Sequence, residues 1–293
     1  MYQNTTSLHF HSYLTTGSST PIVVQDEAGS KFFVKLRGGQ SGRYSYLCEW
    51  ICGHLGYEIG LPINKPGLIT IDETLEIGKI HEEVKDLIHK SFGINLAFPF
   101  YENVRACTPD RAHAVHTHAT AALFAFDIFL LNTDRTIRNP NLMEAEGLLR
   151  SFDYETSFLL MGIMRDKDFS TSDFVLQALR ENPICEAALD EKLVSNMFER
   201  LGGVNLYAIV DSLPEVWISG WEIRPEAVKD KLKKGLTDAI AEPEKFEETL
   251  KFVRTVTPEN EAVKRKRRED NLAKFEAGKI PMEIFGEDGM PLP

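Results

Sequence analysis

The sequence has little cysteine, and its basic residues are outnumbered by acidic ones. Four cysteines in 293 residues are too few for a disulfide framework, which predicts a protein of a reducing compartment such as the cytoplasm. The 33 lysines and arginines against 44 aspartates and glutamates give a net charge of −11. Nucleic acids and anionic membrane surfaces bind basic faces, so neither is expected as a direct partner.

Long apolar runs and the common nucleotide-binding loops are also missing. The longest apolar run, residues 119–131, is interrupted by Thr120 and Asp127 and is too short to span a bilayer. The first lysine is Lys31, so the charged start of a signal peptide is lacking. Neither a P-loop nor a glycine-rich dinucleotide fingerprint occurs, and the cysteines do not form the two pairs of a structural zinc site.

What the sequence does contain is a change of pattern from strands to helices along the chain. Runs typical of strands fall in the first third, at residues 8–14, 21–25, 31–37, 65–71 and 94–101. In the same part, the spacing of apolar residues predicts helices over 44–59 and 72–91. Helices dominate from Thr108 onward, where a hydroxyl cap, a proline and an acid follow one another.

This pattern predicts an α+β fold in which a small β-rich unit precedes a larger, mainly helical one. The expected division is residues 1–104 for the β-rich unit with one long helix, and 105–245 for the helical unit. A C-terminal helix and an extended tail are expected at 246–293.

The run 119–131 is apolar on nearly every side, so it is expected to be a helix buried on all faces. Asp127 lies inside this helix, and a buried carboxylate must be paired or hydrogen-bonded. We therefore expect Asp127 to be structural and to fix the following loop through Arg135.

One region carries most of the chemistry, FDIFLLNTDRTIRN at 126–139 with the strand end that follows it. The buried helix ends in a polar loop that holds Asp134 and Asn139, and Asp153 comes at the end of a short apolar strand. This layout suits phosphoryl transfer. One carboxylate orients the attacking hydroxyl, while an amide and a second carboxylate hold Mg²⁺ against the nucleotide phosphates.

The first third of the chain supplies parts that suit an anion. Lys35 lies on an otherwise apolar strand, where a lysine faces either solvent at an edge or an anion such as phosphate. Glu49 lies off the apolar stripe of the following helix, so it faces the cleft or water and is a candidate partner of Lys35. The turn with Gly17, Ser18 and Ser19 joins two strands and would cover phosphates with its backbone N–H groups.

These residues, in this order, resemble the HipA-like kinases over roughly residues 8–220. The motifs that carry the resemblance are FVK (33–35), Glu49, LGYEIGLP (55–62), FDIFLLNTDRTIRN (126–139), SFDYE (151–155) and LPEVW (213–217). The resemblance implies a two-lobed protein-kinase-like fold that uses ATP and Mg²⁺ to phosphorylate serine or threonine in a protein.

The resemblance also implies roles for single residues. Asp134 would be the catalytic base, and Asn139 and Asp153 would be the metal ligands. Lys35, with Glu49 beside it, would bind the ATP phosphates under the loop that contains Gly17, Ser18 and Ser19.

Two departures from the toxins of this family leave alternatives open. Thr136 stands where those toxins commonly have histidine, and Thr20-Pro21 stands where their phosphate loop often has lysine. A pseudokinase that retains the fold and works as a binding module is one alternative, and a kinase acting on a lipid or small molecule is another. The resemblance further suggests a toxin–antitoxin or phage-related setting, with an antitoxin-like protein as partner.

Overall fold

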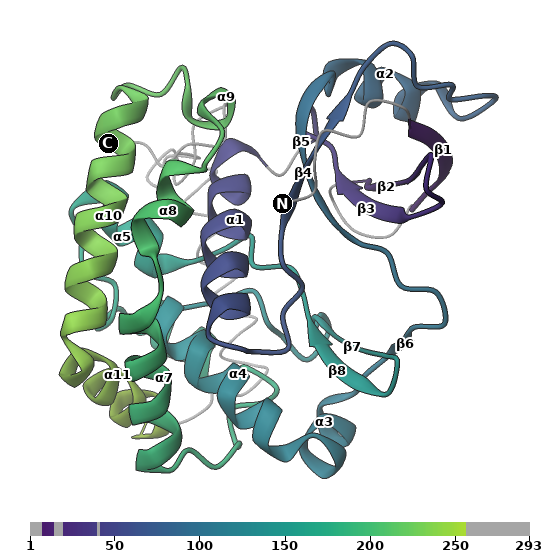
Figure 1. Ribbon diagram of the computed structural model, residues 1–293. Coiled ribbons are helices and arrows are strands. Elements are labelled where there is room, and N and C mark those ends of the chain that lie inside the picture. The colour runs from purple at the N-terminus through teal and green to yellow at the C-terminus, as the bar shows by residue number, and fades with distance from the viewer. Residues whose placement is uncertain (1–7, 15–19, 40–41, 256–293) are drawn as a thin grey trace, which may run out of the picture.

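The computed structural model describes residues 8–14, 20–39 and 42–255, which form a sheet beside a larger body of helices (Figure 1). Five antiparallel strands make the sheet in the order β1-β2-β3-β5-β4. Their bounds are Leu8–Tyr13 for β1, Ile22–Asp26 for β2, Lys31–Lys35 for β3, Gly67–Ile71 for β4 and Gly93–Pro99 for β5. Each strand predicted in the first third of the sequence is present.

The sheet buries one face in the smaller of two hydrophobic cores. Alternate residues of a strand point to the same face. Ile22 and Val24 of β2 therefore enter this core together, as do Phe32 and Val34 of β3. Helix α2, Glu82–Lys90, covers the face with Val84 and Ile88.

Helix α2 is shorter than the sequence predicts, and the expectation of helix over residues 72–81 was wrong. Asp72 Oδ1 accepts a hydrogen bond from the backbone N–H of Thr74 at 2.9 Å, which is a local turn that competes with helix. Gly78 takes a left-handed φ of +64°, which an α-helix does not contain. The chain therefore turns before α2 begins.

The helical body contains the larger core. Its helices are α1 Gly42–Glu58, α3 Pro109–Val115, α4 Thr117–Leu130, α5 Phe158–Arg165, α6 Asp173–Arg180, α7 Glu191–Gly203, α8 Leu206–Asp211, α9 Glu215–Ile218, α10 Pro225–Ala241 and α11 Pro243–Thr255. A small sheet of β6 Arg105–Ala106, β7 Leu142–Ala145 and β8 Leu148–Ser151 lies at its edge.

Two expectations about the start of this body are confirmed. The side chain of Thr108 caps α3 by accepting a hydrogen bond from the N–H of Arg111, and Pro109 is the first residue of the helix. Helix α4 has ten buried residues among its 14, as its apolar sequence predicts. Because α4 is enclosed on nearly all sides, its end is a rigid base for the loop that follows.

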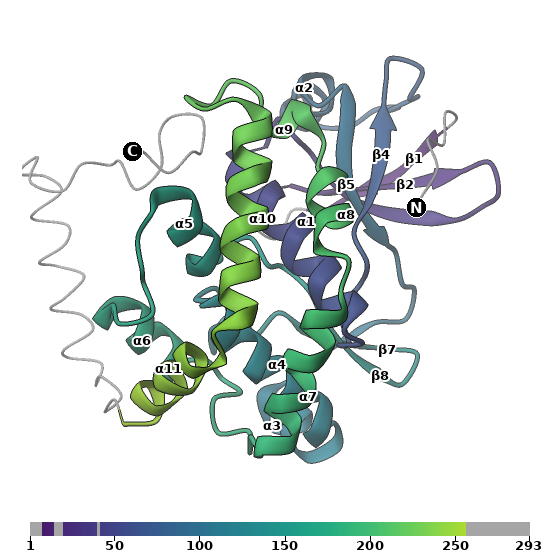
Figure 2. The same ribbon diagram turned by 60° about the vertical axis from the view of Figure 1, so that its left-hand side comes forward.

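Helix α1 belongs by sequence to the β-rich unit, but it packs into the helical body. Its residues share a core with α8 and α9, and both views place α1 beside α8 (Figures 1 and 2). Trp50 Nε1 donates to the carbonyl of Ile209 at 3.2 Å, and Tyr44 Oη donates to the carbonyl of Ser157 at 2.7 Å. Toward the sheet, Tyr46 Oη of the same helix donates to the carbonyl of Lys35 at the end of β3, at 2.8 Å. Helix α1 therefore joins the sheet to the helices.

The described chain ends with α11, so of the C-terminal helix and tail expected at 246–293, residues 256–293 lie outside the described residues. Among helices in the described ranges, none combines the length and apolar character that crossing a bilayer requires.

Gly53 allows α1 to approach the chain that leads into β4. A Cβ atom at Gly53 would lie 2.5 Å from Cγ of the buried ring of Pro66, whereas a Cβ atom at Gly202 of α7 would meet nothing within 4 Å. We expect Gly53→Ala to lower the free energy of unfolding by about 1 kcal/mol, because overpacking outweighs the gain in helix propensity.

The matched control is Gly202→Ala, which gains propensity without a clash and should raise the free energy of unfolding by up to about 1 kcal/mol. Urea denaturation of both variants measures the difference. Equal stabilisation by the two substitutions would contradict the close packing of α1 on Pro66.

Candidate active site

Lys35 is the last residue of β3, and its ammonium group meets Glu49 of α1. The side chain of Lys35 is 10% exposed and that of Glu49 is 2% exposed, and Nζ donates to Glu49 Oε1. The carbonyl of Lys35 is held by Tyr46 of α1, so backbone and side chain of this residue are both fixed against the same helix. The structure thus brings together the pair that the sequence suggested.

The same ammonium group has two more carboxylate partners, from the segment between β8 and α5. Lys35 Nζ donates to Asp153 Oδ1 and to Glu155 Oε1, both at 2.7 Å. Burial alone would lower the pKa of Lys35, but the attraction of Glu49, Asp153 and Glu155 raises the pKa well above its usual 10.5. Burial raises the pKa of Glu49, which lies deepest in the cluster. Glu155 was not among the predicted site residues.

Asp153 is presented to the cluster by a turn in the backbone after β8. Its φ is +64°, a left-handed conformation that costs free energy for residues other than glycine and that aspartate tolerates comparatively well. The next residue, Tyr154, is 1% exposed, and its hydroxyl lies 2.9 Å from Ser151 Oγ. Tyr154 therefore holds the turn in the core while Asp153 and Glu155 on either side reach Lys35.

Asp134 lies in the loop that follows α4. The helix ends at Leu131 in a left-handed conformation with φ +52°, and Asn132 Oδ1 then accepts from the backbone N–H of Asp134 at 3.1 Å. Burial raises the pKa of Asp134 to about 6, and the negative charges of Asp153 and Glu155 add to the shift. Asp134 thus lies within the electrostatic reach of the cluster around Lys35.

A buried ion pair fixes the loop that carries Asp134. Arg135 Nε donates to Asp127 Oδ2 at 2.6 Å, with exposed fractions of 1% and 0%, so the predicted pair is confirmed. The remaining N–H groups of Arg135 reach the carbonyls of Pro140 and Asn141 and the hydroxyls of Ser151 and Tyr154. One guanidinium group therefore holds α4, the loop and the strand end before Asp153 in a single arrangement.

Asp127 has amide partners that complete the arrangement. Asn132 Nδ2 donates to Asp127 Oδ1 at 2.9 Å, and Asn182 Nδ2 donates to Asp127 Oδ2 at 2.9 Å. Asn132 and Asn182 are each 1% exposed. The Asp127 carboxylate thus faces one cation and two amides, which compensates for its removal from water.

The two asparagines of the loop lie differently from what the motif spacing suggests. Asn139 is exposed, and it closes a turn with Thr136 through two backbone hydrogen bonds of 3.0 and 3.1 Å. Asn141 is 2% exposed, and its Nδ2 donates to Asp134 Oδ2 at 3.3 Å. Asn141 Oδ1 is buried and has no hydrogen-bond partner among the described residues. The geometry therefore brings Asn141, rather than Asn139, to Asp134.

The predicted phosphate loop, with Gly17, Ser18 and Ser19, lies outside the described residues. Its flanks are described, and the N–H of Leu14 donates to the carbonyl of Pro21 at 2.9 Å.

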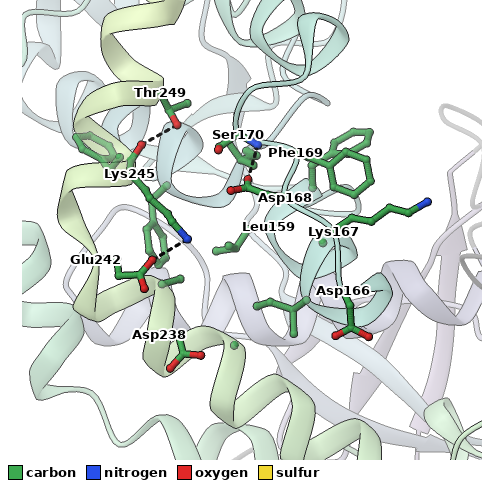
Figure 3. A pocket seen from close by; sticks show the side chains of 18 of the residues that line it. Leu159, Asp166, Lys167, Asp168, Phe169, Ser170, Asp238, Glu242, Lys245 and Thr249 are labelled. Atoms are coloured by element: carbon green, nitrogen blue, oxygen red, sulfur yellow. Dashed lines mark hydrogen bonds and ion pairs between the residues drawn. The ribbon is translucent and has the colours of Figure 1, made fainter.

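A cavity of about 370 Å³ lies apart from the cluster, in the helical body among α4, α5, α10 and α11 (Figure 3). Phe129 and Phe246 contribute to its apolar lining. Charges at its rim have partners of their own, such as Lys245 with Glu242 at 2.7 Å. None of the residues that line it belongs to the cluster around Lys35, so the cavity and the candidate active site are separate.

The fold, with a sheet beside a helical body and a buried lysine–carboxylate cluster between them, is kinase-like. The proinflammatory kinase CtkA of Helicobacter pylori matches it with a TM-score of 0.52 and 11% identity, over 87% of this chain and 99% of CtkA. The MAP kinase LmaMPK10 of Leishmania major aligns with a TM-score of 0.27 and 10% identity, over 94% of this chain and 95% of that one.

The sequence defines the class more closely. The sequence profile of the HipA-like kinase family matches residues 10–240 of this chain. The chain therefore belongs to this family, as its motifs predict. The predicted α+β, kinase-like fold is likewise confirmed. No curated protein has a sequence that matches the chain.

The contacts of Arg135 predict that substitution by lysine lowers the stability of the protein. Lysine can pair with Asp127 but cannot reach two carbonyls and two hydroxyls at once, which leaves buried acceptors unpaired. We expect Arg135→Lys to lower the free energy of unfolding by about 3 kcal/mol. Arg138→Lys, on the exposed part of the same loop, is the control and should stay within about 0.5 kcal/mol of wild type. Equal stabilities in urea would contradict this account of the loop.

The raised pKa of Asp134 predicts a pH-dependent gain in stability when its charge is removed. A carboxyl whose folded pKa of about 6 exceeds its ordinary 3.8 destabilises the folded state increasingly as pH rises through that interval. Asp134→Asn should therefore raise the free energy of unfolding by about 2 kcal/mol above about pH 7, and by much less near pH 4. Thermal melting across this range measures the effect, and a gain that does not grow with pH would contradict it.

Proposed function

We propose that the protein catalyses ATP- and Mg²⁺-dependent transfer of a phosphoryl group to a serine or threonine hydroxyl of a protein. The observation that carries the proposal is the convergence of Lys35, Glu49 and Asp153 beside Asp134. Phosphoryl transfer needs a cation for the phosphates, oxygen ligands for a metal, and a carboxylate for the attacking hydroxyl. Family membership and the kinase fold support the same reaction.

The donor set fits a magnesium ion. Mg²⁺ binds carboxylate and amide oxygens, and the site offers the Asp153 carboxylate together with Asn141 Oδ1, which is buried and has no hydrogen-bond partner within the described part of the chain. We therefore assign the metal positions to Asp153 and Asn141, in place of the predicted Asn139. The bound ion would neutralise charge that develops on the transferred phosphoryl group.

The protein side chains have separate tasks in this proposal. Lys35, positioned by Glu49, binds the ATP phosphates, and the loop with Gly17, Ser18 and Ser19 covers them. Asp134 orients the acceptor hydroxyl and takes its proton, for which its pKa of about 6 is suited near neutral pH. Arg135 and Asn132 hold Asp134 in place without contacting substrate.

A pseudokinase that binds a partner is the second candidate. It is favoured by Thr136 and by Thr20-Pro21, where toxins of this family have other residues. An antitoxin-like protein is the proposed partner in either case. A lipid or small-molecule acceptor would leave the roles of Asp134 and Asp153 unchanged, because the fold does not determine the acceptor.

The test is transfer of labelled γ-phosphate from ATP in the presence of Mg²⁺, with the protein itself and a broad protein mixture as acceptors. Wild type should label protein, and Asp134→Asn should lower the rate by about 10²–10⁴-fold, as loss of a positioned base does. Asn141→Ala should also abolish most activity, while its matched control Asn139→Ala should retain it.

One result would contradict the proposed reaction and another the assignment of the metal ligand. Wild-type protein that binds Mg·ATP but labels no acceptor would support the pseudokinase. Loss of activity in Asn139→Ala together with retention in Asn141→Ala would return the metal position to Asn139.

A further inference from the structure

Two arginines outside the candidate active site share one buried carboxylate. Arg105 of β6 places Nε 3.0 Å from Glu144 Oε2, and Arg111 of α3 donates from Nε to Glu144 Oε1 at 2.7 Å. His116, which follows α3, lies with Nε2 2.9 Å from the same Oε1. The side chain of Glu144, on β7, is only 4% exposed. Glu144 therefore holds the basic groups of two strands and a helix at one place.

These contacts leave the outer ends of both arginines without a protein partner. Each guanidinium group uses Nε on Glu144, and within the described ranges no hydrogen bond engages the Nη atoms of Arg105 or Arg111. The side chains of the two arginines are 71% and 43% exposed. A guanidinium group with its Nη atoms directed to solvent matches the two oxygens of a carboxylate from another molecule.

The charges at this place do not cancel. Hydrogen bonds from Arg111 and His116 lower the pKa of Glu144 to about 2, so Glu144 contributes one negative charge at neutral pH. In the described part of the chain Glu144 is the only carboxylate paired with either arginine, and the two arginines contribute two positive charges. At least one positive charge is therefore in excess, on a protein whose net charge is −11.

The surface beside the arginines suits an extended peptide. The small sheet has the order β6-β7-β8, so β6 is an edge strand of this sheet (Figure 1). Val104, directly before β6, is 47% exposed, and Val115, the last residue of α3, is 55% exposed. Edge strands can pair with extended segments of other proteins, and exposed apolar side chains add contacts to such pairing.

We infer that Arg105 and Arg111 bind an extended acidic segment of a partner protein. Carboxylates of the segment take the Nη groups of the arginines, Glu144 holds these arginines in place, and apolar side chains of the segment contact Val104 and Val115. Nucleic acids and anionic membranes fit less well, because the net charge of −11 repels extended anionic surfaces. The inference goes beyond the proposed function, since this docking surface serves an active kinase and a pseudokinase alike.

The experiment measures the binding of two fluorescein-labelled peptides by fluorescence anisotropy at neutral pH. One peptide has four glutamates and two valines among serines, and the other has glutamine in place of each glutamate. At low salt, wild type should bind the glutamate peptide roughly tenfold more tightly than the glutamine peptide, as charge-assisted hydrogen bonds predict. The difference should shrink at high salt, because counterions screen exposed charges.

Arg105→Gln should remove most of this preference for the glutamate peptide. The variant should melt close to wild type, because Arg105 is largely exposed and Glu144 keeps Arg111 and His116 as partners. Arg105→Lys retains the charge and should restore part of the preference. Arg224→Gln, an equal charge change at an exposed position before α10, is the matched control and should bind as wild type does.

Equal affinity of wild type for the two peptides would overturn the inference. A preference that survives Arg105→Gln would overturn it as well. An equal loss of the preference in Arg224→Gln would do the same, since binding would then follow the total charge of the protein. These outcomes leave the proposed function intact, because phosphoryl transfer is assigned to the separate active site.

Discussion

The ammonium group of Lys35 is the point on which the two parts of the molecule depend. Lys35 is the last residue of β3, and the three carboxylate partners of its ammonium group come from α1 and from the segment after β8. Positions 35, 49, 153 and 155 therefore meet at one nitrogen atom. A buried ammonium group is stable only when its charge is compensated, and here the compensation comes from elements far apart in the sequence. We propose a nucleotide phosphate as the ligand of the same group, so one contact would link the fold to the proposed function.

A second buried cation, Arg135, fixes the loop that carries Asp134. Most of its partners are neutral, whereas those of Lys35 are acidic. Lys35 has three carboxylate partners for one positive charge, and we propose that this group binds the phosphates of a nucleotide. Arg135 has one carboxylate and several neutral acceptors, and all of these except the carbonyl of Pro140 belong to buried residues. Arg135 therefore serves as scaffold, while the Lys35 cluster is the part that we propose to bind the nucleotide.

The sequence predicts helices whose start is marked by a local capping signal. It also predicts ion pairs in which a buried charge requires a partner. Thr108 before Pro109 predicts a capped helix, and Asp127 in an apolar helix predicts a buried partner, which is Arg135. The metal-ligand role of Asn139 stays a prediction. Asn139 is exposed in a turn that two hydrogen bonds with Thr136 close, and Asn141 lies beside Asp134, which counting along the motif does not reveal. The available signal in the sequence was the second asparagine, Asn141, on the other side of Pro140 from Asn139.

The most direct measurement is a crystal structure of the protein with Mg²⁺ and a non-hydrolysable ATP analogue. The account predicts Lys35 Nζ on a phosphate and still on Glu49, with Asp153 and Asn141 Oδ1 on the metal ion. It also predicts Asn139 outside the coordination sphere. A nucleotide bound elsewhere, or a metal ion held by Asn139 while all three carboxylates stay on Lys35, would contradict the account.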